Sequence, residues 1–270
     1  LQRDRMKKCG DTDMEKIMKN AYHRNLLKPI MDPSGVVYEA VESNPLSDVT
    51  ATVWYADDQN GTNAQIWNAA DYEQINPQNT DADGMYGWDV PVGWWQVRFE
   101  KKGYETASTE WMRVPPPRMN LKTAMVSTEA PEVLFANAYS DYIEVIFSQY
   151  MDISKDIILP DGMTGTWQSA ENGYSKVLHI TRPGGFVLGG SVSFTLEGAQ
   201  NYAGKALAPY SSGDLTVFAR PAEIILNYDS VIPVIVGSDL QTTVRIKDSE
   251  GNYMEGVTVE AELSDNVIAK

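Results

Sequence analysis

Histidine and cysteine, the side chains that most often act as bases, nucleophiles and metal ligands, are scarce in this sequence. There are two histidines, His23 and His179, and one cysteine, Cys9. His179 alternates with Leu178 and Ile180 in a strand-like run, which predicts an exposed position on a sheet face. One cysteine cannot form an internal disulfide, and no Cys/His cluster has the spacing of a zinc site.

Other catalytic motifs are also missing from the sequence. No Gly-x-Ser-x-Gly elbow, Gly-rich phosphate loop or His-based metal motif occurs. Acidic residues are abundant, but nothing places two of them across a cleft, as glycoside hydrolysis requires. We therefore predict that the chain is not an enzyme and has no catalytic residues, no metal site and no cofactor.

The segment before Gly84 has the acidic spacing of the first half of a calcium loop. Asn79, Asp81 and Asp83 precede that glycine, but Val90 stands where such a loop carries its bidentate glutamate. A turn closed by the glycine explains the same residues. A hairpin turn is therefore favoured, and weak calcium binding at Asp81 and Asp83 is left open.

Tryptophan is the remaining candidate for binding chemistry, because exposed indoles can serve as stacking platforms for sugars. The stretch GWWQVRFEKKGYETASTEWMRVPPP (93–117) holds three of the seven tryptophans. Strand alternation places Trp95 on the face of Val97 and Phe99, which predicts a core position, and Trp94 on the opposite, polar face. The predicted ligand-binding residues are Trp94 and Trp111. Two further tryptophans are left open, Trp54 and Trp67.

The net charge limits the classes of partner. Lys and Arg number 22 and Asp and Glu 37, which gives a net charge of −15. A field of that sign repels phosphate backbones and anionic lipid, so nucleic acid and membrane surfaces are poor partners. No apolar run reaches the roughly 18 residues that a membrane helix needs, so no membrane insertion is predicted.

These side chains must be positioned mainly by β-strands. From Pro29 onward, short alternating runs are separated by turn signals, the pattern of β-sandwiches. Residues 12–27 instead carry apolar side chains at helical spacing, which predicts a short amphipathic helix. The predicted segments are a helical segment at 1–28, β-sandwiches at 29–128 and 129–219, and a partial β-sandwich at 220–270. Because the sequence starts at Leu1 and stops just after a strand-like run, we expect an internal piece of a longer polypeptide.

The first predicted sandwich resembles the prealbumin-like B-type repeats of collagen-binding surface proteins and the carboxypeptidase regulatory-like domains. The resemblance rests on TDADGMYGWDVPVGWWQVRFEKKGYE and the run before it. Matching positions are Thr80, Asp81, Gly84, Tyr86, Pro91, Gly93, Val97, Gly103 and Tyr104. The sequence departs from the pattern at Trp95, where tyrosine is usual, and at Asp48, where glycine is usual.

The later segments resemble other bacterial surface modules. Phe147, Ser148, Met151 and Asp152, with Tyr202, Ala203, Gly204 and Leu207, are similar to the marks of the SbsA-type Ig-like module of S-layer proteins. VRIKDSEGNYMEGVTVEAEL (244–263) is similar to invasin-type bacterial Ig-like repeats. Together the resemblances imply an all-β fold of tandem Ig-like and prealbumin-like β-sandwiches.

Some B-type surface domains carry a Lys–Asn isopeptide bond promoted by a buried acid. The resemblance would assign those roles to Lys101 or Lys102 with Glu110. No asparagine occupies a convincing position in a terminal strand, so the crosslink is left open.

The resemblances imply a non-catalytic structural or adhesive stalk in a large exported bacterial protein, located outside the cell, on its surface or secreted. The alternative is a carbohydrate-binding accessory region of a secreted glycan-active enzyme. Expected partners are neighbouring domains of the same polypeptide, and a glycan or a host or cell-surface protein. The single cysteine fits both an exported bacterial protein and a reducing cytosol.

Overall fold

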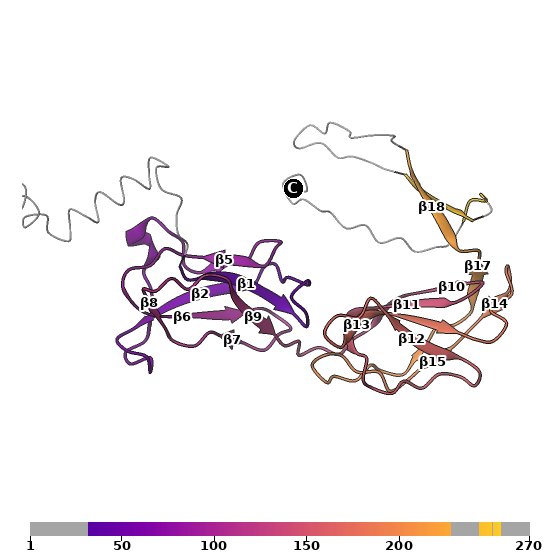
Figure 1. The fold of residues 1–270 in the computed structure, drawn as a ribbon, viewed down its shortest axis with the longest axis horizontal. Coiled ribbons are helices and arrows are strands. Elements are labelled where there is room, and N and C mark those ends of the chain that lie inside the picture. Colours follow the sequence, from indigo (N-terminus) through magenta and orange to yellow (C-terminus); the bar gives the residue numbers. More distant parts are fainter. Residues whose placement is uncertain (1–31, 228–242, 250, 255–270) are drawn as a thin grey trace, which may run out of the picture. The chain divides into compact units, whose positions relative to one another are not determined.

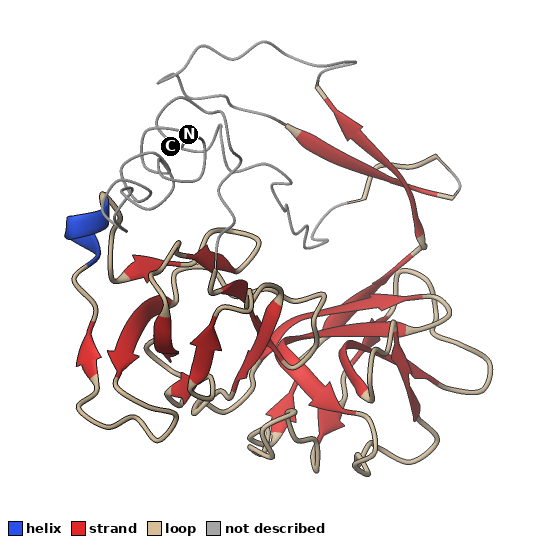
Figure 2. Ribbon diagram, turned by 60° about the vertical axis from the view of Figure 1, so that its left-hand side comes forward, coloured by secondary structure: helices blue, strands red, loops and turns tan. Residues whose placement is uncertain are grey.

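Nearly all of the regular secondary structure in the described part of the chain is β-strand (Figures 1 and 2). The computed structural model describes residues 32–227, 243–249 and 251–254. Within these ranges the only helical element is η1, a short 3-10 helix at Ala69–Tyr72, and no helix could span a membrane. The predicted all-β class is confirmed. The predicted helix at 12–27, with His23, and Cys9 lie outside the described residues.

Two compact units make up the chain. The first comprises Leu1–Val37, Pro45–Lys101 and Thr106–Thr123, and the second comprises Tyr38–Asn44, Lys102–Glu105 and Ala124–Lys270. Strands β1 (Ser34–Glu39) and β9 (Leu121–Met125) therefore contribute residues to both units. The boundaries at 128/129 and 219/220 stay predictions.

Two sheets form the first unit. One has the strand order β5-β1-β9, with β5 at Met85–Gly87. The other is built on β2 (Thr50–Ala56) and β6 (Gly93–Glu100). Short strands flank this pair: β3 (Gln65–Ile66), β4 (Gln78–Asn79), β7 (Ala107–Ser108) and β8 (Met112–Val114). The ring of Tyr86 in β5 contacts the ring of Phe99 in β6, with centroids 5.0 Å apart, so the sheets pack face to face.

Alternating side chains explain why β2 and β6 form the core of this unit. The strands are antiparallel, with Val53 opposite Val97 and Tyr55 opposite Trp95. Val53 and Val97 are 0% exposed and Trp95 is 1% exposed. Trp94 is half-buried on the opposite face. The assignment of Trp95 to the core and of Trp94 to the outer face is therefore confirmed.

The three prolines at 115–117 follow β8 directly and are exposed. Because proline has no N–H to donate, it cannot continue the ladder between β6 and β8, and that ladder ends at Val114. The chain then joins the other sheet as β9.

A six-stranded sheet with the order β12-β13-β11-β10-β17-β14 dominates the second unit. Its strands are β10 (Val133–Tyr139), β11 (Ile143–Asp152), β12 (Thr164–Gln168), β13 (Tyr174–Thr181), β14 (Ser191–Val192) and β17 (Leu215–Phe218). A separate pair consists of β15 (Thr195–Leu196) and β16 (Tyr210–Ser211). Apolar side chains of β11, β13 and β15 meet in one buried cluster that includes Phe147, Leu178 and Leu196.

Strand β18 (Pro221–Leu226) pairs with β19 (Val244–Asp248) in an antiparallel ribbon (Figure 1). Most of the predicted partial sandwich at 220–270 lies outside the described residues, so that domain stays a prediction.

The opposite orientations of the two adjacent tryptophans predict different energetic roles. We expect Trp95→Ala to lower the free energy of unfolding by about 3–5 kcal/mol, because it empties a core position. Trp94→Ala should cost about 1 kcal/mol or less, because its side chain lies on the half-exposed face. Urea unfolding of both variants measures the difference, and equal losses would contradict the observed register.

Candidate functional site

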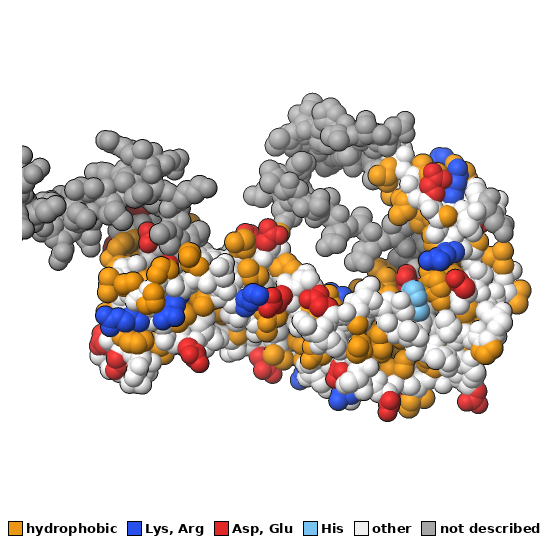
Figure 3. Space-filling view, viewed as in Figure 1, with side chains coloured by type: hydrophobic (Ala, Val, Ile, Leu, Met, Phe, Trp, Pro, Cys, Tyr) orange, Lys and Arg blue, Asp and Glu red, His pale blue; other side chains and the backbone are white. Residues whose placement is uncertain are grey.

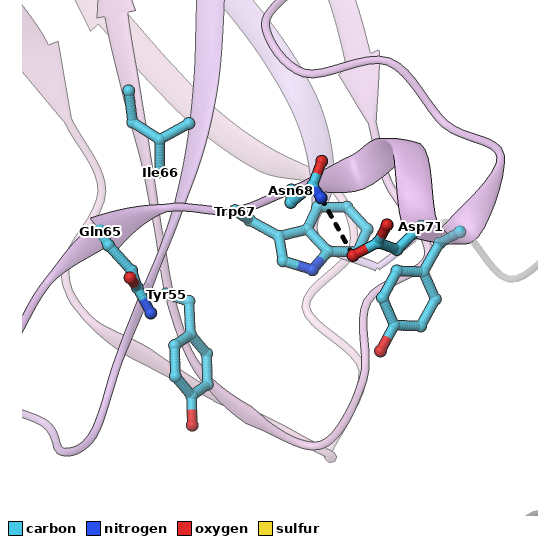
Figure 4. Close-up of a pocket in the computed structure, with 7 residues that line it drawn as sticks. Tyr55, Gln65, Ile66, Trp67, Asn68 and Asp71 are labelled. Atoms are coloured by element: carbon cyan, nitrogen blue, oxygen red, sulfur yellow. Dashed lines mark hydrogen bonds between the residues drawn. The ribbon is translucent and has the colours of Figure 1, made fainter.

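A pocket lies at an edge of the first unit, where the end of β2, the strand β3 and η1 meet (Figure 4). Its volume is about 250 Å³. The lining combines three aromatic, one aliphatic and three polar side chains: Tyr55, Trp67, Tyr72, Ile66, Gln65, Asn68 and Asp71. The sequence had singled out only Trp67 among them, and had left its role open.

One amide side chain fixes the pocket segment to β2. The Asn76 Nδ2 group donates hydrogen bonds to the carbonyl oxygens of Val53 and Trp67, at 2.9 and 3.0 Å. Its Oδ1 accepts from the Val53 N–H at 2.9 Å, and the Trp67 N–H donates to the Val53 carbonyl at 3.2 Å. Trp67 is therefore held in place by its backbone, independently of any ligand.

A row of aromatic rings connects the pocket to the core. The buried ring of Trp95 lies 5.2 Å from the ring of Tyr55 and 5.4 Å from that of Trp67, between centroids. The ring of Tyr72 lies 5.2 Å from that of Trp67. A Cβ added at Gly93 would lie 2.7 Å from the Tyr55 ring, so a side chain there would displace this ring from its observed position.

The polar side of the pocket carries amides and one carboxylate. The Asn68 Nδ2 group donates to Asp71 Oδ2 at 3.0 Å, drawn as the dashed line in Figure 4. Gln65 lies on the other side of Trp67 in that view. Among the described residues, no Lys, Arg or His lines the pocket. The lining can therefore donate and accept hydrogen bonds but cannot neutralise an anion.

The tryptophans predicted to bind ligand do not line this pocket. Trp94 lies half-buried on the outer face of β6. Trp111 packs on the turn at Gly61, where an added Cβ would lie 2.5 Å from its indole nitrogen. The ring of Trp54 is covered by the Arg98 guanidinium, whose Cζ lies 3.9 Å from the ring centroid. Ligand binding by Trp94 and Trp111 stays a prediction.

The acidic segment before Gly84 forms the expected turn. Asp81 Oδ1 accepts hydrogen bonds from the N–H groups of Asp83 and Met85, at 3.0 and 2.8 Å. Gly84 has a φ of +69°, which glycine adopts without strain. Across the described part of the chain, no group of three or more His, Cys, Asp or Glu side chains could hold a metal ion.

The residues considered for an isopeptide crosslink lie at the surface. Lys101 Nζ donates to the carbonyl oxygen of Ser47 at 2.7 Å, and Lys102 and Glu110 are exposed. An exposed Glu110 does not provide the buried acid that such a crosslink requires.

His179 lies half-buried on the outer face of β13, where the sequence predicts an exposed side chain. It faces Glu144 across the sheet, with Nε2 3.4 Å from Oε1. Its ring stacks on Tyr142, with centroids 4.0 Å apart. These contacts account for its reduced exposure.

The second unit contains a half-buried tyrosine whose hydroxyl binds the end of β9. Tyr202 Oη donates to the Met125 carbonyl at 3.1 Å and accepts from the Ser127 N–H at 2.7 Å. Ser127 is 3% exposed. The phenol thus hydrogen-bonds one backbone carbonyl and one backbone N–H at the end of β9.

The other edge of the same segment is also paired. The Glu105 N–H donates to the Val126 carbonyl and the Thr128 N–H donates to the Gly103 carbonyl, both at 2.8 Å. The segment 125–128, next to a predicted domain boundary, is therefore hydrogen-bonded along both sides within the second unit.

A buried carboxylate lies near this tyrosine. Glu39 is 5% exposed; its Oε2 accepts from the Asn44 amide at 3.3 Å, and its Oε1 has no hydrogen-bond partner among the described residues. Burial raises the pKa of Tyr202 above its usual value, and the Glu39 charge raises it further. The same two causes raise the pKa of Tyr104 to about 12.

A comparison with protein-family models finds no match, and neither does a comparison with curated protein sequences. Among solved structures, the N-terminal part of the bacterial S-layer protein SbsC is 22% identical, with a TM-score of 0.28, and covers 47% of this chain and 33% of its own. This chain thus spans about a third of that structure.

Two pilins are also similar to the chain. A point mutant of the shaft pilin spaA from Lactobacillus rhamnosus GG is 13% identical, with a TM-score of 0.28, and covers 70% of this chain and 94% of its own. The major pilin subunit BcpA of Bacillus cereus is 11% identical, with a TM-score of 0.30, and covers 81% of this chain and 82% of its own.

Four buried or half-buried tyrosines predict that the protein loses stability in alkali. Burial raises the pKa of Tyr104 and Tyr139 to about 12, and that of Tyr202 and Tyr86 is raised too, whereas an unfolded tyrosine titrates near 10. The folded state then holds these protons more tightly, so their contribution is complete below about pH 10 and is lost as the pH rises toward 12.

Urea unfolding at increasing pH measures this loss. Absorbance titration at 295 nm should show a fraction of the phenols ionising late in the folded chain and together with the rest in urea. A single transition near pH 10 in the folded protein would contradict the burial of these hydroxyls.

Proposed function

We propose that this chain is a non-catalytic structural segment of a large exported bacterial surface protein, in which it holds other domains away from the cell. The observation that carries the proposal is the pairing of residues 125–128 on both sides. A spacer must resist bending and extension, and a chain segment resists both when its backbone groups are hydrogen-bonded to fixed neighbours.

Tyr202 is the central residue of this pairing. Its ring also contacts that of Tyr174 at the start of β13, with centroids 6.3 Å apart. The hydroxyl therefore binds the 125–128 segment from a ring packed beside the main sheet. The Tyr-Ala-Gly motif that resembles S-layer modules contains this residue, which supports a structural reason for the motif.

The partners proposed for such a segment are neighbouring domains of the same polypeptide, and its location is the cell surface or the extracellular space. Antibodies raised against the chain test the location: they should label intact cells of the source organism. Labelling only after lysis would reject the extracellular part of the proposal.

Removal of the Tyr202 hydroxyl should weaken the segment without emptying the core. In Tyr202→Phe, the Ser127 N–H loses its acceptor while the ring stays, so we expect a loss of about 1–3 kcal/mol. Hydrogen exchange of the Ser127 amide should accelerate by about tenfold for each 1.4 kcal/mol lost locally. In single-molecule extension, the variant should unfold at lower force.

Tyr210→Phe is the matched control, because Tyr210 is a half-buried tyrosine of the same unit that packs on Phe194. It should leave exchange at Ser127 unchanged. If Ser127 exchanges equally fast in the unaltered chain and in Tyr202→Phe, the hydrogen bond does not hold the segment and the stiffness argument fails.

A further inference from the structure

The pocket between β3 and η1 exposes apolar side chains to solvent, and packing of the core does not require this exposure. Ile66 is 55% exposed and Tyr72 is 43% exposed, although the ring of Tyr72 packs on that of Trp67, which in turn contacts the buried Trp95. The backbone of Trp67 is fixed by Asn76, so this residue is held in place before any ligand arrives. Concave sites with aromatic walls and a few polar groups are typical of small-ligand sites.

The charges around the pocket restrict the ligand. None of the described residues that line it is basic, Asp71 adds a negative charge, and the chain carries a net charge of −15. Phosphates and acidic sugars would therefore be repelled. One oxygen of Asp71 already accepts from Asn68, which reduces what the carboxylate offers a cation and leaves the amides as the main polar groups.

The remaining chemistry matches a ligand with one apolar face and many hydroxyl groups. The rings of Trp67 and Tyr72 offer faces for C–H groups, and Gln65 and Asn68 carry amides that both donate and accept. A pyranose ring has this combination. The pocket volume of about 250 Å³ is just below the range of about 300–1,000 Å³ for drug-sized ligands, which suits a single sugar ring.

We propose that the pocket formed by Tyr55, Gln65, Trp67, Asn68, Asp71 and Tyr72 binds one neutral pyranose unit of a glycan. The rings stack on the sugar face and the amides bind its hydroxyls. This site differs from the outer face with Trp94, and it does not depend on the structural role of the 125–128 segment. A single open site of this size gives weak binding, which repetition along a surface would strengthen through avidity.

Saturation-transfer difference NMR on the 270-residue chain tests the proposal. The probes are the methyl glycosides of glucose, galactose, mannose and N-acetylglucosamine at millimolar concentration. At least one should receive saturation, strongest at the C–H protons of one ring face. No signal from any of the four would overturn the proposal. Signal from tetramethylammonium or from a proline-rich peptide, with none from the sugars, would assign the pocket to a cation or a peptide instead.

Variants locate the binding. Tyr72→Ala should weaken the sugar about tenfold, since one stacked ring contributes roughly 1.4 kcal/mol, and Asn68→Ala should weaken it as well. Tyr72 is exposed, so its loss should leave the melting temperature nearly unchanged. Tyr253→Ala, the matched control at a 58% exposed tyrosine, should bind normally. Binding that survives Tyr72→Ala but is lost in Trp94→Ala would place the sugar on the outer face and reject this pocket.

Discussion

The antiparallel pairing of β2 with β6 is the constraint on which the first unit depends. Its register runs without a break from Thr50 opposite Glu100 to Ala56 opposite Trp94. Because side chains alternate, a slip of one residue would exchange the two faces of a strand. The register therefore puts Trp95 in the core opposite Tyr55, and the pocket forms where this pair meets Trp67. The core and the candidate sugar site thus share one set of aromatic contacts.

In the second unit, hydrogen bonds of buried polar groups fix the local structure, as the register of β2 and β6 does in the first unit. Asn201 is 1% exposed, and its Oδ1 accepts from the N–H groups of Ala203 and Lys205, at 3.0 and 2.7 Å. These bonds form the turn that presents Tyr202 to the end of β9. Polar groups cost free energy when buried unless they are hydrogen-bonded. The Asn201 bonds therefore stabilise this turn and disfavour other conformations in which the buried amide would lose its partners.

The structural and binding proposals draw on different parts of the molecule and are compatible. The structural proposal depends on backbone groups of residues 125–128 that hydrogen-bond to the Tyr202 hydroxyl. The binding proposal depends on aromatic rings of the pocket that are partly exposed to solvent. Basic and acidic side chains of the described residues do not gather into one large patch on the face shown in Figure 3. For this acidic chain, recognition through ring stacking and neutral hydrogen bonds is therefore favoured over recognition through a charged surface patch.

The sequence by itself determined the all-β class and the opposite faces of Trp94 and Trp95, because strand periodicity and turn residues are local properties. It also identified Gly84 and the Asp81 turn. Only the tertiary structure decided that Trp67, Tyr72 and Tyr55 share a pocket, since the contact depends on how β3 and the 67–76 loop fold onto β2. The same holds for Tyr202 and Ser127, which lie 75 residues apart. Such long-range pairs leave no periodic signal, because each residue alone looks like an ordinary strand or turn position.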